Sequence, residues 1–279
     1  MRDKITAPAI RGRKRHAGAE PVVMVTAYDT PGARIADAAG VDMILVGDSV
    51  SDNVLGHPDT LHVDVGVMAH HVGAVARAAP RALVVGDLPW MSYHVSVEDT
   101  VRNAAQLVRA GAEVVKLEGG RVRVPMIEAI TAAEIPVVGH LGLTPQSVHA
   151  MGGFKVQARE AAAAESLLLD AKAIVEAGCF AMVLEGIPDV VAERITAEVD
   201  VPTIGIGAGP ACDGQVLVFH DVLGLGDRTP PRFVRRYADL RGVAVEALSA
   251  WAADVRSGEF PSDAETYHAP RAALGPTDT

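Results

Sequence analysis

Eight short apolar runs recur along the chain; seven end in glycine, proline or an acidic residue, and the run 42–49 ends in Gly-Asp-Ser. Most are continuously apolar rather than alternating, which is typical of parallel strands covered on both faces. Their regular spacing predicts one extended series of strands. The runs are residues 22–29, 42–49, 82–89, 114–119, 136–142, 180–186, 202–209 and 215–221.

The segments between these runs have the spacing of helices. From Leu61 to Ala79, apolar residues recur at steps of three and four, which predicts a helix with one buried face. Ser96 is placed to cap the start of another helix, and Pro188 suits the first turn of a third. Residues 161–177 predict a further helix that stops at a glycine.

Strand and helix therefore alternate along most of the chain. Eight such units in about 200 residues predict a (β/α)₈ TIM barrel, because a doubly wound open sheet more often has five to seven strands. No repeat or flexible linker divides the sequence. We expect a basic arm over residues 1–20, a barrel catalytic domain over 21–260, and a weakly ordered tail over 261–279.

Composition narrows the functional class. The 279 residues are 49% hydrophobic and carry a net charge of −10, which argues against nucleic-acid binding. No apolar run reaches the roughly 18 residues of a membrane-spanning helix, so we expect no membrane association. The two cysteines, with no signal-peptide core, indicate reduced thiols and a cytoplasmic location.

The first 16 residues are an exception to the acidic balance. We expect this arm to be a solvated segment, as charge runs usually are, although it could touch RNA or another anionic partner. Its cations are Arg2, Lys4, Arg11, Arg13, Lys14, Arg15 and His16.

Acidic residues end three consecutive predicted strands, at Asp48, Asp87 and Glu118. In a barrel the catalytic groups come from the carboxyl ends of the strands, although a single acid there is more often a turn former or a helix cap. Three carboxylates at one mouth would repel each other without a cation, and oxygen ligands favour Mg²⁺. Such a metal could chelate a 2-oxo acid and stabilise its enolate.

Further polar residues end neighbouring strands. Lys116 lies two positions before Glu118 and so points to the same side of its strand, where it could neutralise a substrate carboxylate or pair with an acid. His140 could donate to substrate oxygens or be a core histidine bonded to backbone. Glu185, across the mouth from the acids, follows an apolar stretch whose desolvation would make it a better base, unless it is an exposed loop residue.

Two loops could also contribute to a site. Residues 140–157 form a long connection with paired glycines, which could close on a substrate as a lid. Residues 205–215 are glycine-rich and follow the seventh strand, where many barrels bind phosphate. That phosphate signal is weak, because tight turns explain the glycines equally well.

Several long, gapless motifs now allow a comparison with known families. From about residue 22 to 240 the chain resembles the ketopantoate hydroxymethyltransferases. The motifs are TAYD from Thr26, VGDS from Val46, GDLPWMSY from Gly86, VKLEG from Val115, GHLGLTPQS from Gly139, GGFKVQ from Gly152, VLEG from Val183, GIGAG from Gly205 and CDGQVLV from Cys212.

This resemblance implies a barrel of the phosphoenolpyruvate/pyruvate type. It also implies transfer of a one-carbon unit from 5,10-methylenetetrahydrofolate to 3-methyl-2-oxobutanoate, giving 2-dehydropantoate for pantothenate biosynthesis, with Mg²⁺ as cofactor. Family members are typically large homo-oligomers, often decamers, so we expect a homo-oligomer here.

The resemblance also implies roles for individual residues. Asp48 and Asp87 match metal ligands that meet the substrate, and Glu118 a third ligand acting directly or through water. Further roles are the substrate contacts Ser49, Lys116 and His140, and the catalytic acid/base Glu185.

Two rival functions remain at this point. A Mg²⁺-dependent lyase that cleaves a C–C bond of a 2-oxo or 2-hydroxy acid would want the same metal and enolate. Such lyases carry a reactive cysteine in a loop of the type Lys, Lys or Arg, Cys, Gly, His, which this sequence lacks. A catalytically silent scaffold would have no reason to place an acid or a histidine at five successive strand ends.

Overall fold

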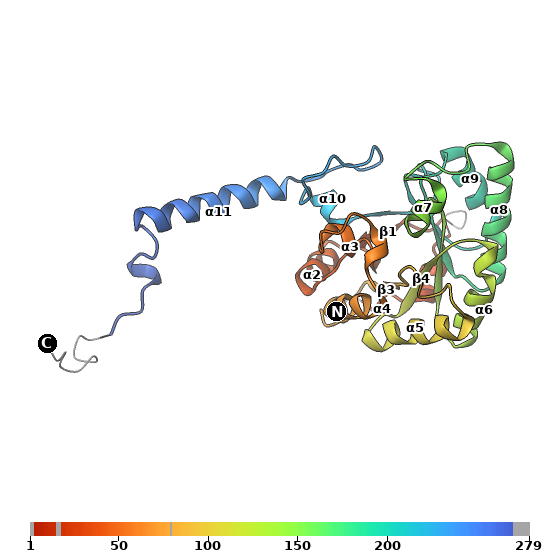
Figure 1. Cartoon of the computed structure of the whole chain (residues 1–279), viewed down its shortest axis with the longest axis horizontal. Helices are drawn as coiled ribbons and strands as arrows, with labels where there is room; N and C mark the ends of the chain where they lie inside the picture. Colours follow the sequence, from red (N-terminus) through yellow and green to blue (C-terminus); the bar gives the residue numbers. More distant parts are fainter. Residues whose placement is uncertain (1–2, 15–17, 79, 270–279) are drawn as a thin grey trace.

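Eight parallel strands close into a barrel in the computed structural model, which describes residues 3–14, 18–78 and 80–269 (Figure 1). Each strand pairs with the next in sequence, and β8 closes on β1, so the predicted TIM barrel is confirmed. Four strands extend through the polar residues near the ends of the predicted runs, whereas Asp29, Asp48 and Asp221 lie beyond the ends of their strands. The strands are β1 Val22–Thr26, β2 Met43–Val46, β3 Leu83–Asp87, β4 Val114–Glu118, β5 Val137–Gly142, β6 Ala181–Glu185, β7 Thr203–Ile206 and β8 Gly214–Leu217.

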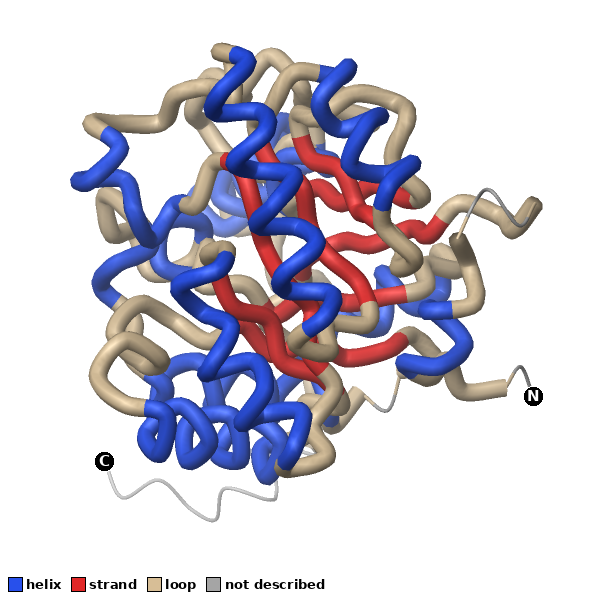
Figure 2. Tube along the Cα trace, turned by 90° about the vertical axis from the view of Figure 1, so that its right-hand side faces the viewer, coloured by secondary structure: helices blue, strands red, loops and turns tan. Residues whose placement is uncertain are grey.

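Helices cover the outside of the strands (Figure 2). Ser96 caps the start of α5 as predicted, with its hydroxyl accepting from the Asp99 amide. The predicted helix over 161–177 is confirmed as α8. The helices are α1 Ala7–Arg11, α2 Thr30–Ala38, α3 Val50–Asn53, α4 Val65–Ala76, α5 Val97–Ala110, α6 Val124–Ala132, α7 Val148–Met151, α8 Ala161–Glu176, α9 Asp189–Glu198, α10 Phe219–Leu223 and α11 Leu240–Ser257.

Two predicted helix starts were wrong. The helix expected from Leu61 begins at Val65, because the Asp64 carboxylate accepts the Val67 amide and so fixes a later first turn. The residues before it form a separate 3₁₀ turn, η2 Thr60–His62, and Ala79 lies outside the described residues. Pro188 precedes α9 as its N-cap in extended backbone, with ψ 141°, rather than occupying its first turn.

The core has two layers that follow the pleat of the strands. Residues such as Ile44, Val115 and Leu117 face outward and pack beneath the helices. Alternate residues such as Met43 and Val114 fill the lower barrel interior. Because side chains alternate along a strand, the residue two positions after an inner-layer residue also points into the barrel, closer to the carboxyl ends of the strands. At that end, polar residues follow the apolar ones.

The described part of the basic arm packs against the base of the barrel. Ile10 is fully buried in the inner apolar cluster. Lys14 is 5% exposed, and its Nζ lies 2.8 Å from the Asp213 carboxylate and 2.6 Å from the Thr196 carbonyl oxygen. The expectation of a solvated arm is therefore wrong for Lys4, Arg13 and Lys14, which meet acids and carbonyl oxygens of the barrel, whereas Arg11 is exposed. Arg2, Arg15 and His16 lie outside the described residues.

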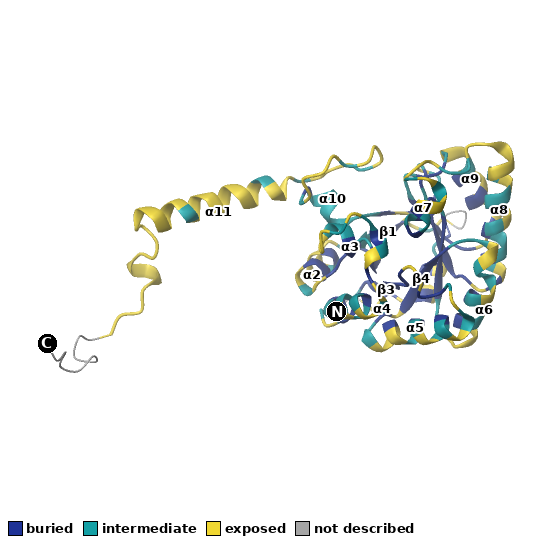
Figure 3. Ribbon diagram, in the orientation of Figure 1, coloured by how far each residue is buried: buried dark blue, intermediate teal, exposed yellow. Residues whose placement is uncertain are grey.

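The chain leaves the barrel after β8. No helix is described between β7 and β8, and α10 is short, so the outer face at this seam is poorly covered. Val23 of β1, which points outward, is 50% exposed. Helix α11 projects away from the barrel and buries none of its residues (Figures 1 and 3). Residues 261–269 of the predicted tail are exposed, and residues 270–279 lie outside the described chain.

Candidate active site

A cavity of about 1110 Å³ opens at the carboxyl ends of the strands. All seven residues that the sequence singled out as candidate site residues line it. Strand register explains part of this convergence, because Asp87 pairs with Lys116 across β3 and β4, and Glu118 pairs with His140 across β4 and β5. The seven are Asp48, Ser49, Asp87, Lys116, Glu118, His140 and Glu185.

Lys116 lies among the acids and is itself buried, at 3% exposure. Its Nζ is 2.7 Å from Asp87 Oδ1, 3.8 Å from Glu118 Oε1 and 3.3 Å from His140 Nδ1. Burial opposes its charge, but the carboxylates outweigh this and raise the pKa of Lys116. Lys116 and Glu118 share one side of their strand, as their spacing predicted, and Lys116 is held as a cation.

His140 bridges two carboxylates. Its Nδ1 is 3.2 Å from Glu118 Oε1 and its Nε2 is 3.2 Å from Glu185 Oε2. Burial and the Lys116 charge oppose protonation, yet the two carboxylates prevail and raise the pKa of His140 to about 9. Despite its burial, the neighbouring His140 and Lys116 lower the pKa of Glu118. The histidine therefore carries a proton at neutral pH.

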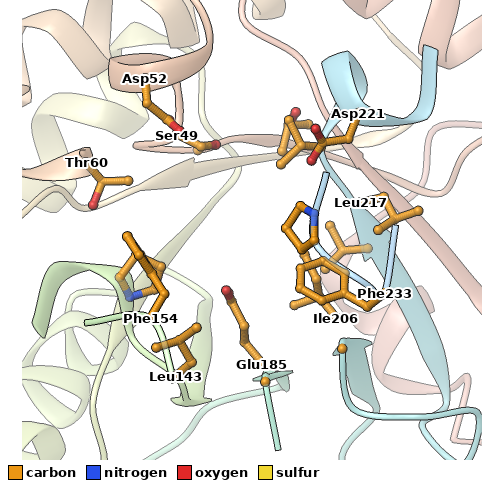
Figure 4. A pocket seen from close by; sticks show the side chains of 18 of the residues that line it. Ser49, Asp52, Thr60, Leu143, Phe154, Glu185, Ile206, Leu217, Asp221 and Phe233 are labelled. Atoms are coloured by element: carbon orange, nitrogen blue, oxygen red, sulfur yellow. The ribbon is translucent and has the colours of Figure 1, made fainter. Parts of the chain in front are cut away.

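Glu185, predicted to lie across the mouth from the acids, is on β6, four strands from β2 in the closed barrel. Strand β6 pairs with β5, so Glu185 reaches His140 directly and joins the same network. Its side chain points into the centre of the cavity (Figure 4). Glu185 is thus partly exposed to the cavity while being oriented by a protonated histidine.

Asp48 and Asp87 carry the least compensated charge. Burial, followed by the charges of Asp87 and Glu118, raises the pKa of Asp48 well above its ordinary value. Burial also raises the pKa of Asp87 despite the nearby lysine. Asp87 Oδ1 contacts the Lys116 ammonium at 2.7 Å, and Asp87 Oδ2 accepts the Asp48 backbone amide at 3.2 Å. The negative charge of the Asp48 and Asp87 pair is thus only partly compensated.

The net charge of the network also leaves room for a bound cation. The four carboxylates, Asp48, Asp87, Glu118 and Glu185, face two cations, Lys116 and protonated His140, which leaves an excess of two negative charges. In the described chain, however, no three His, Cys, Asp or Glu side chains are arranged to hold a metal ion together. Glu118 is engaged by His140 and by a backbone amide, and metal ligation by Asp48, Asp87 and Glu118 stays a prediction.

That amide belongs to Gln146, which the sequence reasoning missed together with Tyr93. The Gln146 backbone donates to Glu118 Oε2 at 3.1 Å, and its side-chain amide donates to Asp48 Oδ2 at 2.9 Å and to the Leu88 carbonyl at 3.0 Å. Tyr93 donates to Gln146 Oε1 at 2.5 Å and accepts the Glu118 amide. Gln146 therefore joins two of the predicted metal ligands.

Ser49 follows Asp48 at the start of α3 and lines the cavity. Its hydroxyl is 2.8 Å from the Tyr28 hydroxyl, a second partner that the sequence reasoning missed. Asp29, another acid beyond the end of a strand, caps α2 by accepting the Gly32 amide and belongs to a structural turn. Only some of the polar residues that follow the strands therefore serve the cavity.

Both predicted loops reach the cavity. The 140–157 connection contains η4 Pro145–Ser147 and α7, and its Phe154 and Lys155 lie at the rim. Gly207 and Gly209 of the glycine-rich loop line the opposite wall, both with positive φ. Closure of the first loop and phosphate binding by the second stay predictions.

The sequence also matches known proteins. A family model described as ketopantoate hydroxymethyltransferase matches residues 4–263. The chain belongs to the ketopantoate hydroxymethyltransferase family. Two relatives called 3-methyl-2-oxobutanoate hydroxymethyltransferase support this membership. One, from Methylobacterium sp. (strain 4-46), is 55% identical over 92% of this chain and 89% of its own. The other, from Ignicoccus hospitalis, is 56% identical over 90% of this chain and 95% of its own.

Solved structures of other enzymes share the fold of this family member at low sequence identity. A phosphonopyruvate hydrolase in complex with oxalate and Mg²⁺ superposes with a TM-score of 0.61 at 14% identity, covering 95% of this chain and 92% of the other. A 2,3-dimethylmalate lyase, described as a PEP mutase/isocitrate lyase superfamily member, gives a TM-score of 0.58 at 19% identity, covering 94% and 91%. These likenesses show that the closed parallel barrel is shared.

Proposed function

We propose that the protein transfers a hydroxymethyl group from 5,10-methylenetetrahydrofolate to 3-methyl-2-oxobutanoate, giving 2-dehydropantoate for pantothenate biosynthesis. The observation that carries this proposal is the network around Lys116, in which Asp48, Asp87, Glu118, His140 and Glu185 line one cavity. These residues lie in the motifs shared with the family, and their chemistry suits a 2-oxo acid that must lose a proton.

The donor set fits Mg²⁺. This ion is usually held by one or two carboxylates and keeps several waters, so a three-carboxylate cage is not required. The raised pKa of Asp48 and its backbone contact with Asp87 support these two side chains as the direct ligands. Glu118, which is engaged elsewhere, would act through water. When bound, the ion would polarise the 2-oxo oxygen and offset the excess negative charge.

The remaining residues would bind and orient the oxo acid. Lys116 is a buried cation that can face the substrate carboxylate, and the Ser49 hydroxyl can donate to the same group while Tyr28 holds it in place. His140 carries a proton between Glu118 and Glu185 and can donate to a substrate oxygen. These contacts would fix the C3–H bond within reach of Glu185.

The chemical step then follows from Glu185. Its carboxylate accepts the proton from C3 as that C–H bond breaks, and the electrons left at C3 form the new bond to the folate methylene carbon. Both C–N bonds of the methylene carbon break, and a water oxygen becomes the hydroxyl group. The two folate nitrogens each receive one proton, one that came from C3 through Glu185 and one from the water. Glu185, partly exposed to the cavity and oriented by His140, is placed to carry that proton.

We also propose that the protein works as a homo-oligomer, up to the expected decamer. Helix α11 exposes apolar side chains at helical spacing, including Leu248 at 63%, Trp251 at 53% and Val255 at 46%. The β8–β1 seam exposes Val23 in turn. Two apolar surfaces that are apart in one chain can cover each other between copies. Sedimentation of wild type and Trp251→Asp tests this, because a monomeric wild type would contradict the assembly.

The substrates proposed here are metabolites of the cytoplasm, which is the location we assign. In the described residues, no helix is long and apolar enough to cross a membrane.

A direct experiment tests the proposed reaction. Purified protein with 3-methyl-2-oxobutanoate, 5,10-methylenetetrahydrofolate and Mg²⁺ should form 2-dehydropantoate, followed by NMR, and omission of any one component should stop it. Loss of the oxo acid without folate, with a shorter product, would instead support the lyase function. If neither reaction occurs, the proposed function is contradicted and the scaffold alternative is favoured.

A further inference from the structure

The cavity is larger than its polar network requires. Ligand pockets for drug-sized molecules measure roughly 300–1,000 Å³, and this one has a volume of about 1110 Å³. A five-carbon oxo acid against the Lys116 network would leave much of that space open. The remaining wall comes from the ends of β7 and β8, from α10, and from residues 225–233.

Part of that second wall is apolar. Ile206, Leu217 and Phe233 lie together on it, and Phe154 stands on the other side of Glu185 (Figure 4). Gly207 makes the position of the Phe233 ring possible, since a Cβ there would come within 2.8 Å of the ring. Its φ of +61° also favours glycine. The wall is thus built to present an aromatic face to the cavity.

One half-buried carboxylate on this wall, Asp221 of α10, accepts no hydrogen bond within the described chain, although the charges of His220 and Arg236 favour its ionised form. Burial, followed by the charge of Asp52, raises its pKa. Asp52 differs, because it accepts from the Asn53 amide at 3.1 Å and lies 3.8 Å from Arg228. Asp221 is therefore an acceptor in need of a donor.

Asp221 lies next to the proposed reaction centre. It adjoins His220, whose ring centroid is 5.6 Å from that of Tyr28. The Tyr28 hydroxyl is in turn 2.8 Å from Ser49 Oγ. The side chains of Asp221, Ser49 and Glu185 point toward one central space (Figure 4). A ligand held by Asp221 would therefore meet the oxo acid bound at Ser49 and Glu185.

We propose that Asp221 and Phe233 bind the pterin ring of the folate cosubstrate, an inference that rests on the function proposed above. The 2-amino group and adjacent ring N–H of a pterin form a planar pair of donors, which a carboxylate can accept with two parallel hydrogen bonds. The ring face stacks on Phe233 in offset geometry. A flat heterocycle with paired donors is the ligand class that this wall fits.

The rim of the cavity carries positive charge, which suits the glutamate end of the folate. Lys155, Arg228 and Arg232 line the outer part of the cavity and are exposed. A folate bound with its pterin at Asp221 would extend its glutamate carboxylates outward to these cations. The acidic group inside the cavity therefore matches the N–H donors of the pterin, and the basic groups at the rim match the anionic glutamate tail. The reverse orientation would place the tail carboxylates against Asp221 and would be repelled.

Steady-state kinetics of Asp221→Asn tests the site. The amide keeps the size of the side chain but replaces one acceptor with a donor, which opposes a pterin N–H. We expect the KM for 5,10-methylenetetrahydrofolate to rise about 10- to 100-fold, while the KM for 3-methyl-2-oxobutanoate changes less than about twofold. Asp227→Asn is the matched control, because Asp227 is an exposed acid on the same rim, and its folate KM should remain that of wild type.

Phe233→Leu gives a second, independent variant. It keeps an apolar side chain and should raise the folate KM about 5- to 100-fold through lost stacking. If Asp221→Asn fails to fold, this variant alone decides the outcome. A folate KM within twofold of wild type in every folded variant would overturn the site.

Deuterium exchange at C3 of the oxo acid tests the proposed reaction separately from the pterin site. Wild type should exchange the C3 proton of 3-methyl-2-oxobutanoate in D₂O with Mg²⁺ and without folate, because only Glu185 and the inner network are needed. Asp221→Asn should exchange at the wild-type rate while its folate KM rises. Normal wild-type turnover with an unchanged variant KM would refute the pterin site alone. Absence of both exchange and turnover in wild type would refute the function and the site with it.

Discussion

Replacing Gln146 by leucine should weaken both the fold and the metal site. The change removes the donors to Asp48 Oδ2 and to the Leu88 carbonyl, and the acceptor of the Tyr93 hydroxyl. A neutral hydrogen bond contributes about 1 kcal/mol and one to a charged group about 1.5–3 kcal/mol. Since leucine fills a similar volume, we expect the free energy of unfolding to fall by about 3.5–5 kcal/mol, the sum of two neutral bonds and one to a charged group.

The same substitution should change the Mg²⁺ requirement. Residues that orient metal ligands typically contribute 10- to 100-fold to metal affinity, so the Mg²⁺ concentration for half-maximal turnover should rise by about that factor. Urea denaturation and Mg²⁺ titration of activity measure the two effects separately.

Tyr93→Phe is the control for this experiment. It removes the hydroxyl that contacts Gln146 and the Glu118 amide, and it leaves the Gln146 contact with Asp48 in place. It should lower stability by about 1–3 kcal/mol with little change in the Mg²⁺ requirement. An unaltered Mg²⁺ requirement in folded Gln146→Leu, or an equal rise in both variants, would refute the positioning role.

Three further substitutions test other parts of the account. Asp48→Asn should abolish Mg²⁺-dependent substrate binding yet raise metal-free stability at pH 8. Because the pKa of Asp48 is raised in the folded protein, wild-type stability falls as pH rises above about 4; unfolding curves that do not converge near pH 4 would contradict this. Glu185→Gln should keep the fold and Mg²⁺ binding but lose about 10²- to 10⁴-fold in turnover, and near-normal turnover would exclude Glu185 as the base. Lys14→Met should lower the free energy of unfolding by about 3–5 kcal/mol, because Asp213 loses its buried cation; an unchanged denaturation midpoint would contradict this role.

The strands and most of the inner network could be predicted because their physical signals are local. Apolar runs mark strands wherever both faces are covered, and Asp48, Asp87 and Glu118 stand where those runs stop. The two-residue period of a strand predicted that Lys116 and Glu118 lie on the same side. Both are buried in the structure. Strand ends at one mouth converge by topology, so no long-range information was needed.

Other features depend on contacts between distant segments and left no local signal. Gln146 lies on a 3₁₀ turn beyond β5, and it reaches Asp48 only because the barrel brings β2 and β5 to one mouth. Lys14 looked like part of a solvated charge run, because its partners Asp213 and Thr196 lie far along the chain. No sequence signal showed that α11 leaves the barrel, because apolar residues at helical spacing fit packing against any apolar surface.

The fate of the methylene carbon tests the central claim most directly. Protein given 3-methyl-2-oxobutanoate, Mg²⁺ and 5,10-methylenetetrahydrofolate labelled with ¹³C at the methylene group should form 2-dehydropantoate with the label in its hydroxymethyl carbon, seen by NMR. Removing Mg²⁺ or substituting Glu185 by glutamine should suppress the labelled signal. Consumption of the oxo acid without appearance of the label in that carbon, or no consumption at all, would contradict the proposed reaction.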